Sequence, residues 1–303
     1  MSFSKRAMPF SVVITTQNRR AFLSRAVLSI LANTLLPSEI IIVNDGGRDI
    51  DTDTGPFNSQ EVPILVINNT SPMGANYARN QGVYSAVNEI VFFLDDDDAV
   101  ISTSFETRLI AFDSDSVGLS YTGIHIVRDV ELDRSVREVK DCALDINQVD
   151  LLTRGNLIGS TSRVAIRKKY FIEAGGFDQD LDCFQDYDLW IRMAGVAEVR
   201  FDQQSSVLYT IHSSGNQTSA KFEKYLKATD YLTQKYKYEL DKRGAYRSFR
   251  SNLYLRVALS AAKVNASIKR RYSLKSFLLK PSLKSFVLAV MPVRLLKKMY
   301  PFV

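Results

Sequence analysis

The sequence lacks the features of a disulfide-bonded or membrane-spanning protein. Its 303 residues contain two cysteines, Cys142 and Cys183, which have neither a CxxC spacing nor metal-ligand neighbours and therefore suit a reducing cytoplasm. No run of about 18 consecutive apolar residues occurs, so we expect no transmembrane helix. The short apolar run after Lys5 and Arg6 contains Pro9 and no small-residue cleavage site, which indicates a first strand rather than a signal peptide.

Acidic residues are missing from the C-terminal part of the chain. Residues 242–303 contain 15 Lys and Arg and no Asp or Glu, whereas the first 241 residues contain 24 basic and 33 acidic residues. This division predicts that two parts of the chain meet different partners. Basic and apolar residues are interleaved along residues 267–298, and Pro281 and Pro292 divide this segment into two or three short helices.

We expect this basic segment to bind an anionic membrane surface, because its charges attract the headgroups and its apolar residues can enter the interface. A helical cap that packs on the rest of the chain is the alternative. Nucleic acid is disfavoured because the remaining 241 residues are acidic.

Two common nucleotide-binding motifs are also missing. Neither G-x-G-x-x-G nor G-x-x-x-x-G-K-[ST] occurs, so neither a Rossmann dinucleotide site nor a P-loop is supported. The first hundred residues nevertheless alternate short buried-type strands with amphipathic helices, in the order strand, helix, strand, strand, helix, strand. This order predicts an α/β fold with a mixed, mostly parallel sheet flanked by helices.

The expected elements are as follows. Strands are predicted at residues 10–15, 39–43, 62–67, 89–94 and 163–167, shorter antiparallel strands within 117–139, helices at 19–32, 74–87, 168–174 and 186–194, and a helical chain after Ser219.

Four adjacent carboxylates, Asp95 to Asp98, follow the predicted strand 89–94. Like charges so close together raise one another's pKa, and a divalent cation such as Mn²⁺ or Mg²⁺ removes that cost because it takes oxygen ligands. The carboxyl ends of strands are also where open α/β sheets place ligands. The run therefore predicts a metal site, with a solvated acidic turn as the alternative.

Three further segments carry polar residues at strand or helix ends. Thr15–Arg19 and Val43–Gly47 open onto the same sheet edge as the acidic run, where Asp45 can accept a hydrogen bond from a base N–H. Plain turns and a helix cap are the alternative for both. Asp186 begins the helix predicted at 186–194, where the helix dipole favours the carboxylate form, which suits a general base. An N-cap is the alternative.

Five segments, in this order, resemble the family 2 glycosyltransferases with the GT-A fold. They are Phe10–Arg19, Ile40–Gly47, Met73–Asn80, Phe93–Asp98 and Gly175–Arg192, and the similarity extends over residues 10–215. The resemblance implies a nucleotide-diphosphate-sugar donor, with a UDP-sugar favoured, a divalent metal, and inversion at the anomeric carbon.

The resemblance also implies roles for single residues. Thr15 and Asp45 match residues that hold the nucleobase, Arg79 matches an A-R-N arginine that meets donor phosphate or sugar, Asp95 and Asp96 match positions near the ribose and the sugar phosphate, and Asp97 matches the metal ligand that ends the DxD motif. Asp186 matches the catalytic base. His212 matches a tail position where a histidine can approach the metal, with a structural histidine as the alternative.

Two residues depart from the family pattern. Gln17 stands where an aromatic residue usually lies against the base, which weakens the expectation of uracil. Gln185 replaces the Glu that normally precedes the base and often contacts the acceptor, so we expect a different acceptor.

We therefore expect a GT-A catalytic domain over residues 1–218 and a helical, basic, membrane-associating extension over 219–303. The expected activity is metal-dependent transfer of a sugar to a hydroxyl of a glycan, lipid-linked and belonging to bacterial surface polysaccharide biosynthesis of the O-antigen or capsule type. The expected location is the cytoplasm, peripheral on the inner face of the plasma membrane. A nucleotidyltransferase and a non-catalytic metal-dependent sugar- or nucleotide-binding protein are the alternatives.

Overall fold

A computed structural model describes residues 8–129, 134–140, 145–212, 222–262 and 264–293. The contacts divide the chain into a sheet unit, residues 1–147, 158–179 and 192–211, and a helical unit, residues 148–157, 180–191 and 212–303. The domain boundary expected between residues 218 and 219 lies outside the described residues and stays a prediction. Cys142 also lies outside them, whereas Cys183 is a buried free thiol.

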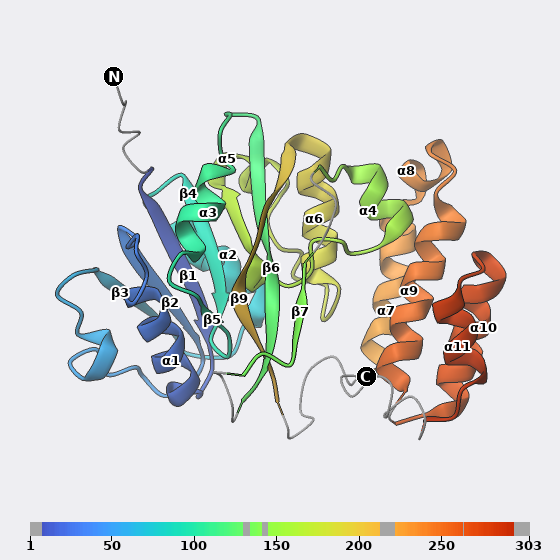
Figure 1. Ribbon diagram of the computed structural model, residues 1–303, viewed down its shortest axis with the longest axis horizontal. Coiled ribbons are helices and arrows are strands. Elements are labelled where there is room, and N and C mark those ends of the chain that lie inside the picture. Colours follow the sequence, from blue (N-terminus) through green and yellow to red (C-terminus); the bar gives the residue numbers. More distant parts are fainter. Residues whose placement is uncertain (1–7, 130–133, 141–144, 213–221, 263, 294–303) are drawn as a thin grey trace. The chain divides into compact units, whose positions relative to one another are not determined.

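The described residues of the sheet unit form one nine-stranded sheet. Its strands are β1 (Phe10–Thr16), β2 (Glu39–Asp45), β3 (Ile64–Asn69), β4 (Ile90–Asp95), β5 (Ala99–Val100), β6 (Val117–Arg128), β7 (Arg137–Val139), β8 (Val164–Arg167) and β9 (Glu198–Ile211). The order is β3-β2-β1-β4-β8-β6-β9-β5, with β7 paired to β6. The strands β3, β2, β1 and β4 are parallel neighbours, and β8 is antiparallel to both β4 and β6 (Figure 1). The predicted mixed α/β sheet is confirmed.

The expectation of short antiparallel strands within 117–139 is wrong for β6. This strand is a single run of 12 residues that pairs antiparallel with β7 and β8 but parallel with β9. Its first seven residues are all buried, so both faces of this part of the strand are covered. A strand that is buried on both faces lacks alternating polarity, so its length is hard to predict from the sequence.

Helices cover both faces of the parallel strands. The even-numbered side chains of β1, such as Val12 and Ile14, belong to a core shared with α1 (Arg20–Leu31) and α3 (Ser104–Ile110). The odd-numbered Val13 points toward α2 (Ala75–Ser85) on the other face, and a Cβ on Gly82 of that helix would lie only 2.4 Å from Val13 Cγ1. The same face of the sheet carries Phe93, whose ring lies 6.3 Å from that of Phe171 in α5 (Lys168–Glu173).

The helical unit is built from α4 (Gln148–Arg154), the first seven residues of α6 (Gln185–Val196), α7 (Phe222–Lys235), α8 (Lys237–Lys242), α9 (Tyr246–Ala261), α10 (Ala266–Leu279) and α11 (Leu283–Val290). Its centre is aromatic: the ring of Phe249 lies 6.0 Å from both Tyr187 and Tyr236. The predicted break at Pro281 is confirmed, since α10 ends and α11 begins on either side of it. None of the described helices has the length and apolarity needed to cross a bilayer.

A buried ion pair ties α6 to α7 within this unit. Asp188 is fully buried, with Oδ1 lying 2.9 Å from Lys235 Nζ and accepting a hydrogen bond of 2.7 Å from the Tyr236 hydroxyl. Asp188→Ala leaves the partly buried Lys235 ammonium and the buried Tyr236 hydroxyl without this acceptor, so we expect it to lower the free energy of unfolding by about 3 kcal/mol in urea titrations. Asp188→Asn should cost less, since its amide oxygen can still accept from Tyr236.

Asp182 supplies the control for this prediction. It pairs with Lys224 at 3.2 Å, but its side chain is 72% exposed. Asp182→Ala should change the free energy of unfolding by at most about 1 kcal/mol. Equal losses for the two alanine variants would show that Asp188 does not hold the unit together.

Candidate functional site

The carboxyl ends of three parallel strands meet at one edge of the sheet. Thr15 of β1 lies opposite Val43 of β2 on one side and opposite Asp95 of β4 on the other. The polar residues that follow these strands therefore converge, as the order of strands predicted. This edge brings Thr15, Asp45 and the acidic run into one neighbourhood of the sheet unit.

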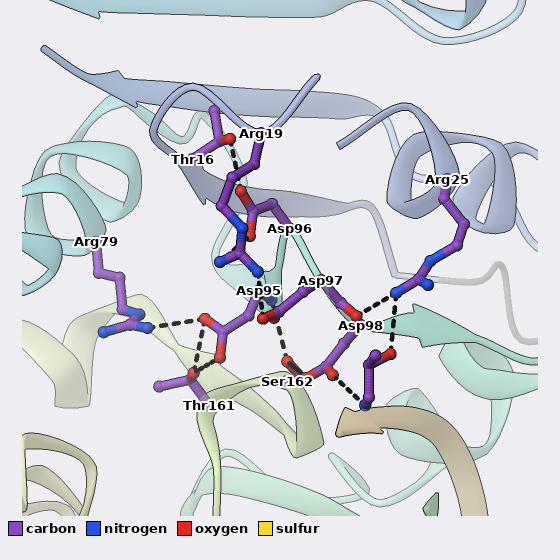
Figure 2. A network of polar contacts seen from close by, with 11 residues as sticks. Thr16, Arg19, Arg25, Arg79, Asp95, Asp96, Asp97, Asp98, Thr161 and Ser162 are labelled. Carbon is purple, nitrogen blue, oxygen red and sulfur yellow. Dashed lines mark hydrogen bonds and ion pairs between the residues drawn. The ribbon is translucent and has the colours of Figure 1, made fainter. Parts of the chain in front are cut away.

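Arg19 bridges the middle of the acidic run. Its Nη1 lies 3.0 Å from Oδ1 of Asp96, and its Nη2 pairs with Oδ2 of Asp97 (Figure 2). The Thr16 hydroxyl donates a hydrogen bond of 2.6 Å to the other oxygen of Asp96. The Arg19 guanidinium, which follows β1 closely in the sequence, is thus shared by two of the four carboxylates.

Asp95 has a different set of partners. Its Oδ1 accepts a hydrogen bond of 2.8 Å from Arg79 Nη2, and the Thr161 hydroxyl reaches the same carboxylate (Figure 2). Arg79 is buried on α2, with its guanidinium 5.5 Å from the ring centroid of Phe177. Its Nη1 has no hydrogen-bond partner among the described residues. A buried donor left over in this way is available to an oxygen of a ligand.

Asp98 is a structural residue at the end of the run. It is fully buried, and its two oxygens accept hydrogen bonds from the Thr210 backbone N–H at 2.9 Å and the Ser162 hydroxyl at 2.6 Å. Burial, reinforced by the charges of Asp97 and Asp95, raises the pKa of Asp98 well above its ordinary value. Its contacts attach the acidic run to β9 and to the turn before β8.

The acidic run is favourable for a further cation. Burial raises the pKa of Asp96 to about 6, although Thr16 and Arg19 oppose the shift. In the described part of the chain, no group of three or more His, Cys, Asp or Glu side chains is arranged to hold a metal ion. The side chains of Asp95 and Asp97, however, are 27% and 22% exposed and offer hard oxygen donors. They fit a Mg²⁺- or Mn²⁺-type site in which one or two carboxylates share the ion with phosphate oxygens of a ligand.

Asp45 fixes the loop that leads into α2. Its carboxylate oxygens accept hydrogen bonds of 2.8 Å from the backbone N–H groups of Met73 and Gly74. This approach requires glycine at position 46, which has φ of 72° and where a Cβ would lie 2.3 Å from the nitrogen of Pro72. Oδ1 also accepts from Asn69 Nδ2 at 3.3 Å, whereas Oδ2 retains a second lone pair with which Asp45 can accept from a base.

A pocket of about 790 Å³ opens beside the acidic run. Its lining comes from the end of β1, the start of α1 and the loop after β2, and it includes Arg19, Arg20 and Arg48. Three arginines in one pocket suit a multiply charged anion such as a diphosphate. These arginines have no role predicted from the sequence. Their positions pointed to this pocket, because they follow two strands whose carboxyl ends lie at the same edge of the sheet.

Asp186 belongs to the helical unit, in the first turn of α6. Its Oδ1 accepts a 2.7 Å hydrogen bond from the Tyr187 backbone N–H, and its Oδ2 lies 3.3 Å from Asn156 Nδ2. The turn before it is strained, since Phe184 has φ of 59° and packs its ring 4.9 Å from that of Tyr225. The side chain is partly exposed, so a solvent-accessible carboxylate stands at a helix start.

His212, a candidate metal ligand, and Cys183 are also located. His212 is half-buried in the helical unit and follows Thr210, the partner of Asp98, by two residues. Its role as a metal ligand stays a prediction, as do the roles of the other candidate residues. Burial raises the pKa of the Cys183 thiol to about 12, so this cysteine is not a nucleophile near neutral pH.

Comparisons with known proteins converge on one family. The family described as Glycosyl transferase family 2 matches residues 11–173. "Uncharacterized glycosyltransferase YwdF" of Bacillus subtilis is 31% identical over 235 residues, which cover 76% of this chain and 84% of YwdF. An uncharacterized glycosyltransferase of Rickettsia felis is 28% identical over 237 residues, but the match covers only 38% of that longer protein.

Solved structures of S. aureus TarS have a similar fold. TarS 1–349 in complex with UDP-GlcNAc superimposes with a TM-score of 0.55 at 13% identity, covering 97% of this chain and 92% of that one. The same TarS fragment has also been solved with UDP.

Proposed function

This chain belongs to glycosyl transferase family 2 and has the mixed α/β GT-A fold, and we propose that it transfers a sugar from a nucleotide-diphosphate donor to a hydroxyl of a glycan, with inversion at the anomeric carbon. The observation that carries the proposal is the arrangement at the carboxyl edge of the sheet. Asp95, Asp96 and Asp97 stand there between two arginines, Arg19 and Arg79, beside a pocket of nucleotide size.

We assign the donor to the sheet unit. The arginine-lined pocket and the unpartnered Nη1 of Arg79 suit the diphosphate. We assign Thr15 and Asp45 to the base, and Asp95 and Asp96 to the ribose and the sugar phosphate. TarS binds UDP and UDP-GlcNAc, which supports a UDP-sugar as the donor here.

We assign Mn²⁺ or Mg²⁺ to Asp97, with Asp95 and Asp96 beside it and His212 as a second candidate ligand. When bound, such a cation neutralises charge that develops on the leaving diphosphate. Arg19 holds the carboxylates together in this structure and can turn toward the diphosphate.

Asp186 is assigned as the general base. Its carboxylate takes the proton of the acceptor hydroxyl while the acceptor oxygen forms its bond to the anomeric carbon and the bond from that carbon to the diphosphate breaks. The Tyr187 N–H and Asn156 hold this carboxylate in one orientation. We further propose a lipid-linked glycan acceptor of the bacterial surface-polysaccharide type, and a location on the inner face of the plasma membrane.

A donor screen tests this proposal. Thermal unfolding would be followed with UDP-, GDP- and dTDP-sugars, each with and without Mn²⁺, and transfer or slow hydrolysis of the bound donor would be measured. A UDP-sugar at 100 times its Kd should raise Tm by roughly 5 °C or more, with the larger shift in Mn²⁺. Hydrolysis of the sugar–phosphate bond would separate an enzyme from a binding module. The absence of any shift with all three classes would contradict the proposal.

Arg79→Gln should weaken donor binding by about 10- to 100-fold, because a charge-assisted hydrogen bond to phosphate is lost. The matched control is Arg167→Gln. Arg167 is also buried, pairs with Glu89 at 3.0 Å and lies 5.7 Å from the Phe112 ring. It lies at the opposite end of β4, beside Ile90. Both variants are compared by titrating the Tm shift with donor, and equal donor affinities would remove Arg79 from the site.

A further inference from the structure

Helix α10 packs with its polar side inward. Ser273 and Ser276 are fully buried, whereas Leu274 and Leu278 are 43% and 73% exposed. Its outer face also carries Arg270 and Arg271, which are both exposed. A surface helix of a soluble protein normally shows the reverse arrangement, with apolar residues toward the core.

Hydrogen bonds between small polar residues hold this inverted helix in place. The Ser276 hydroxyl donates to the Ser251 carbonyl of α9 at 2.9 Å, and the Ser251 hydroxyl donates to the Ser276 carbonyl at the same distance. Lys269 is buried as well, and its Nζ donates to the carbonyl of Met291. The inward contacts are therefore satisfied, and the outward leucines are not a consequence of loose packing.

Helix α11 continues the apolar surface. Leu283, Phe286 and Val290 are 79%, 49% and 62% exposed, while Leu288 and Ala289 of the same helix are buried. The Phe286 ring lies 5.9 Å from that of Phe277 in α10, so the two helices adjoin at this point. We call Leu274, Leu278, Leu283, Phe286 and Val290 the α10–α11 face. Exposed large apolar side chains on two adjoining helices indicate a contact surface.

The exposed charged side chains on these two helices and on the turn between them are all positive. Arg270, Arg271, Lys280 and Lys284 are exposed on the same two helices and the turn between them, and residues 242–303 contain no carboxylate side chain. Two copies of this face would bring like charges together, which disfavours self-association through it. A nucleic acid would leave the outward leucines without an apolar partner, since the basic side chains around them would meet its phosphates.

We propose that the α10–α11 face is the surface by which this protein docks on an anionic lipid bilayer. The proposal rests on the peripheral location given under the proposed function and goes further by naming the residues. Leu278, Leu283 and Phe286 enter the interface between headgroups and acyl chains, and the flanking arginines and lysines lie at the headgroup phosphates. The serine-rich packing against α9 is what leaves the leucines free to face outward.

Co-sedimentation with vesicles tests the proposal on the full chain. Vesicles of phosphatidylcholine alone would be compared with vesicles containing about one third phosphatidylglycerol, at low and at high salt. The full chain should bind the anionic vesicles and should be released by salt. Binding to neither kind of vesicle at low salt would overturn the proposal.

Two pairs of substitutions locate the contact. The double variant Leu278→Gln and Leu283→Gln should bind at least about tenfold more weakly, because it removes two apolar side chains from the interface. Its control is Ile110→Gln and Val87→Gln in the sheet unit, where the exposed fractions are 70% and 81% against 73% and 79%. The double variant Arg270→Gln and Arg271→Gln should lose roughly fivefold for each charge, with the exposed Arg137 and Lys169 as the control pair.

Failure of vesicle binding and failure of donor binding can be told apart. Vesicle binding is measured without any nucleotide sugar, so a chain that binds vesicles but no donor would contradict the proposed function and leave the α10–α11 face intact. A leucine variant that binds vesicles as strongly as its control would overturn the assignment of this face. If that variant instead changed the oligomeric state in analytical ultracentrifugation, the face would be an interface between copies of the chain.

Discussion

The Asp186→Asn variant should lower kcat by at least about 100-fold while leaving donor affinity close to that of the unchanged protein. Asparagine has nearly the same shape as aspartate but cannot take a proton from the acceptor hydroxyl. Its side-chain oxygen can still accept the hydrogen bond from the Tyr187 N–H, so the start of α6 should remain intact. Initial rates at saturating donor and acceptor, together with the donor-induced Tm shift, measure the two effects separately.

The alternative for Asp186 is a helix cap without a catalytic role, and Asp186→Ala separates the two. A cap is lost in the alanine variant but kept in the asparagine variant. A purely structural residue should therefore cost about 1 kcal/mol of stability with alanine and no loss of rate with asparagine. Asp182→Asn is the control for charge, since this carboxylate lies four residues earlier and is exposed. If Asp186→Asn turned over at the unchanged rate, the base would lie elsewhere. Asp188 is a poor substitute because Lys235 and Tyr236 already occupy its carboxylate.

The strands that carry the candidate site could be predicted because they are short and apolar on both faces. β1, β2 and β4 are runs of Val, Ile and Phe bounded by turn residues, a pattern typical of parallel strands under helices. Strand β9 gave no such pattern. Its middle contains Asp202 and Gln203, Gln203 has φ of 62°, and its register with β6 shifts at several points. A bulged strand breaks the two-residue period, so the sequence alone did not reveal it.

The sequence predicts the position of the acidic run but not the environment of each of its carboxylates. The sequence predicts that four carboxylates gather at a strand end, but adjacent residues there differ greatly in environment. Asp98 is fully buried and satisfied by Ser162 and Thr210, which are distant in the sequence, whereas the neighbouring Asp97 side chain stays 22% exposed. Only the tertiary structure distinguishes the structural carboxylate from the one that is open to a ligand.

This difference leads to the prediction for Asp97. Asp97→Asn should abolish the Mn²⁺-dependent part of the donor-induced Tm shift and lower the transfer rate by at least about 1000-fold, because a metal ion at the leaving diphosphate contributes several kcal/mol to stabilisation of the transition state. The fold should persist, since Asp97 is partly exposed and Arg19 keeps its contact with Asp96. Asp98→Asn should behave differently and reduce stability, because it disturbs a buried carboxylate with two structural hydrogen bonds.

Asp150 provides the matched control for Asp97. Its side chain is 27% exposed and pairs with an arginine, Arg154, at 3.4 Å, so Asp150→Asn removes the same charge from a similar environment in α4. The control should retain both the Tm shift in Mn²⁺ and the transfer rate. Metal removal supplies an independent measurement: EDTA should reduce the unchanged protein to the activity of Asp97→Asn and should have no effect on that variant. Full transfer in EDTA would instead mean that Arg19, already bridging Asp96 and Asp97, supplies the positive charge at this edge without a metal.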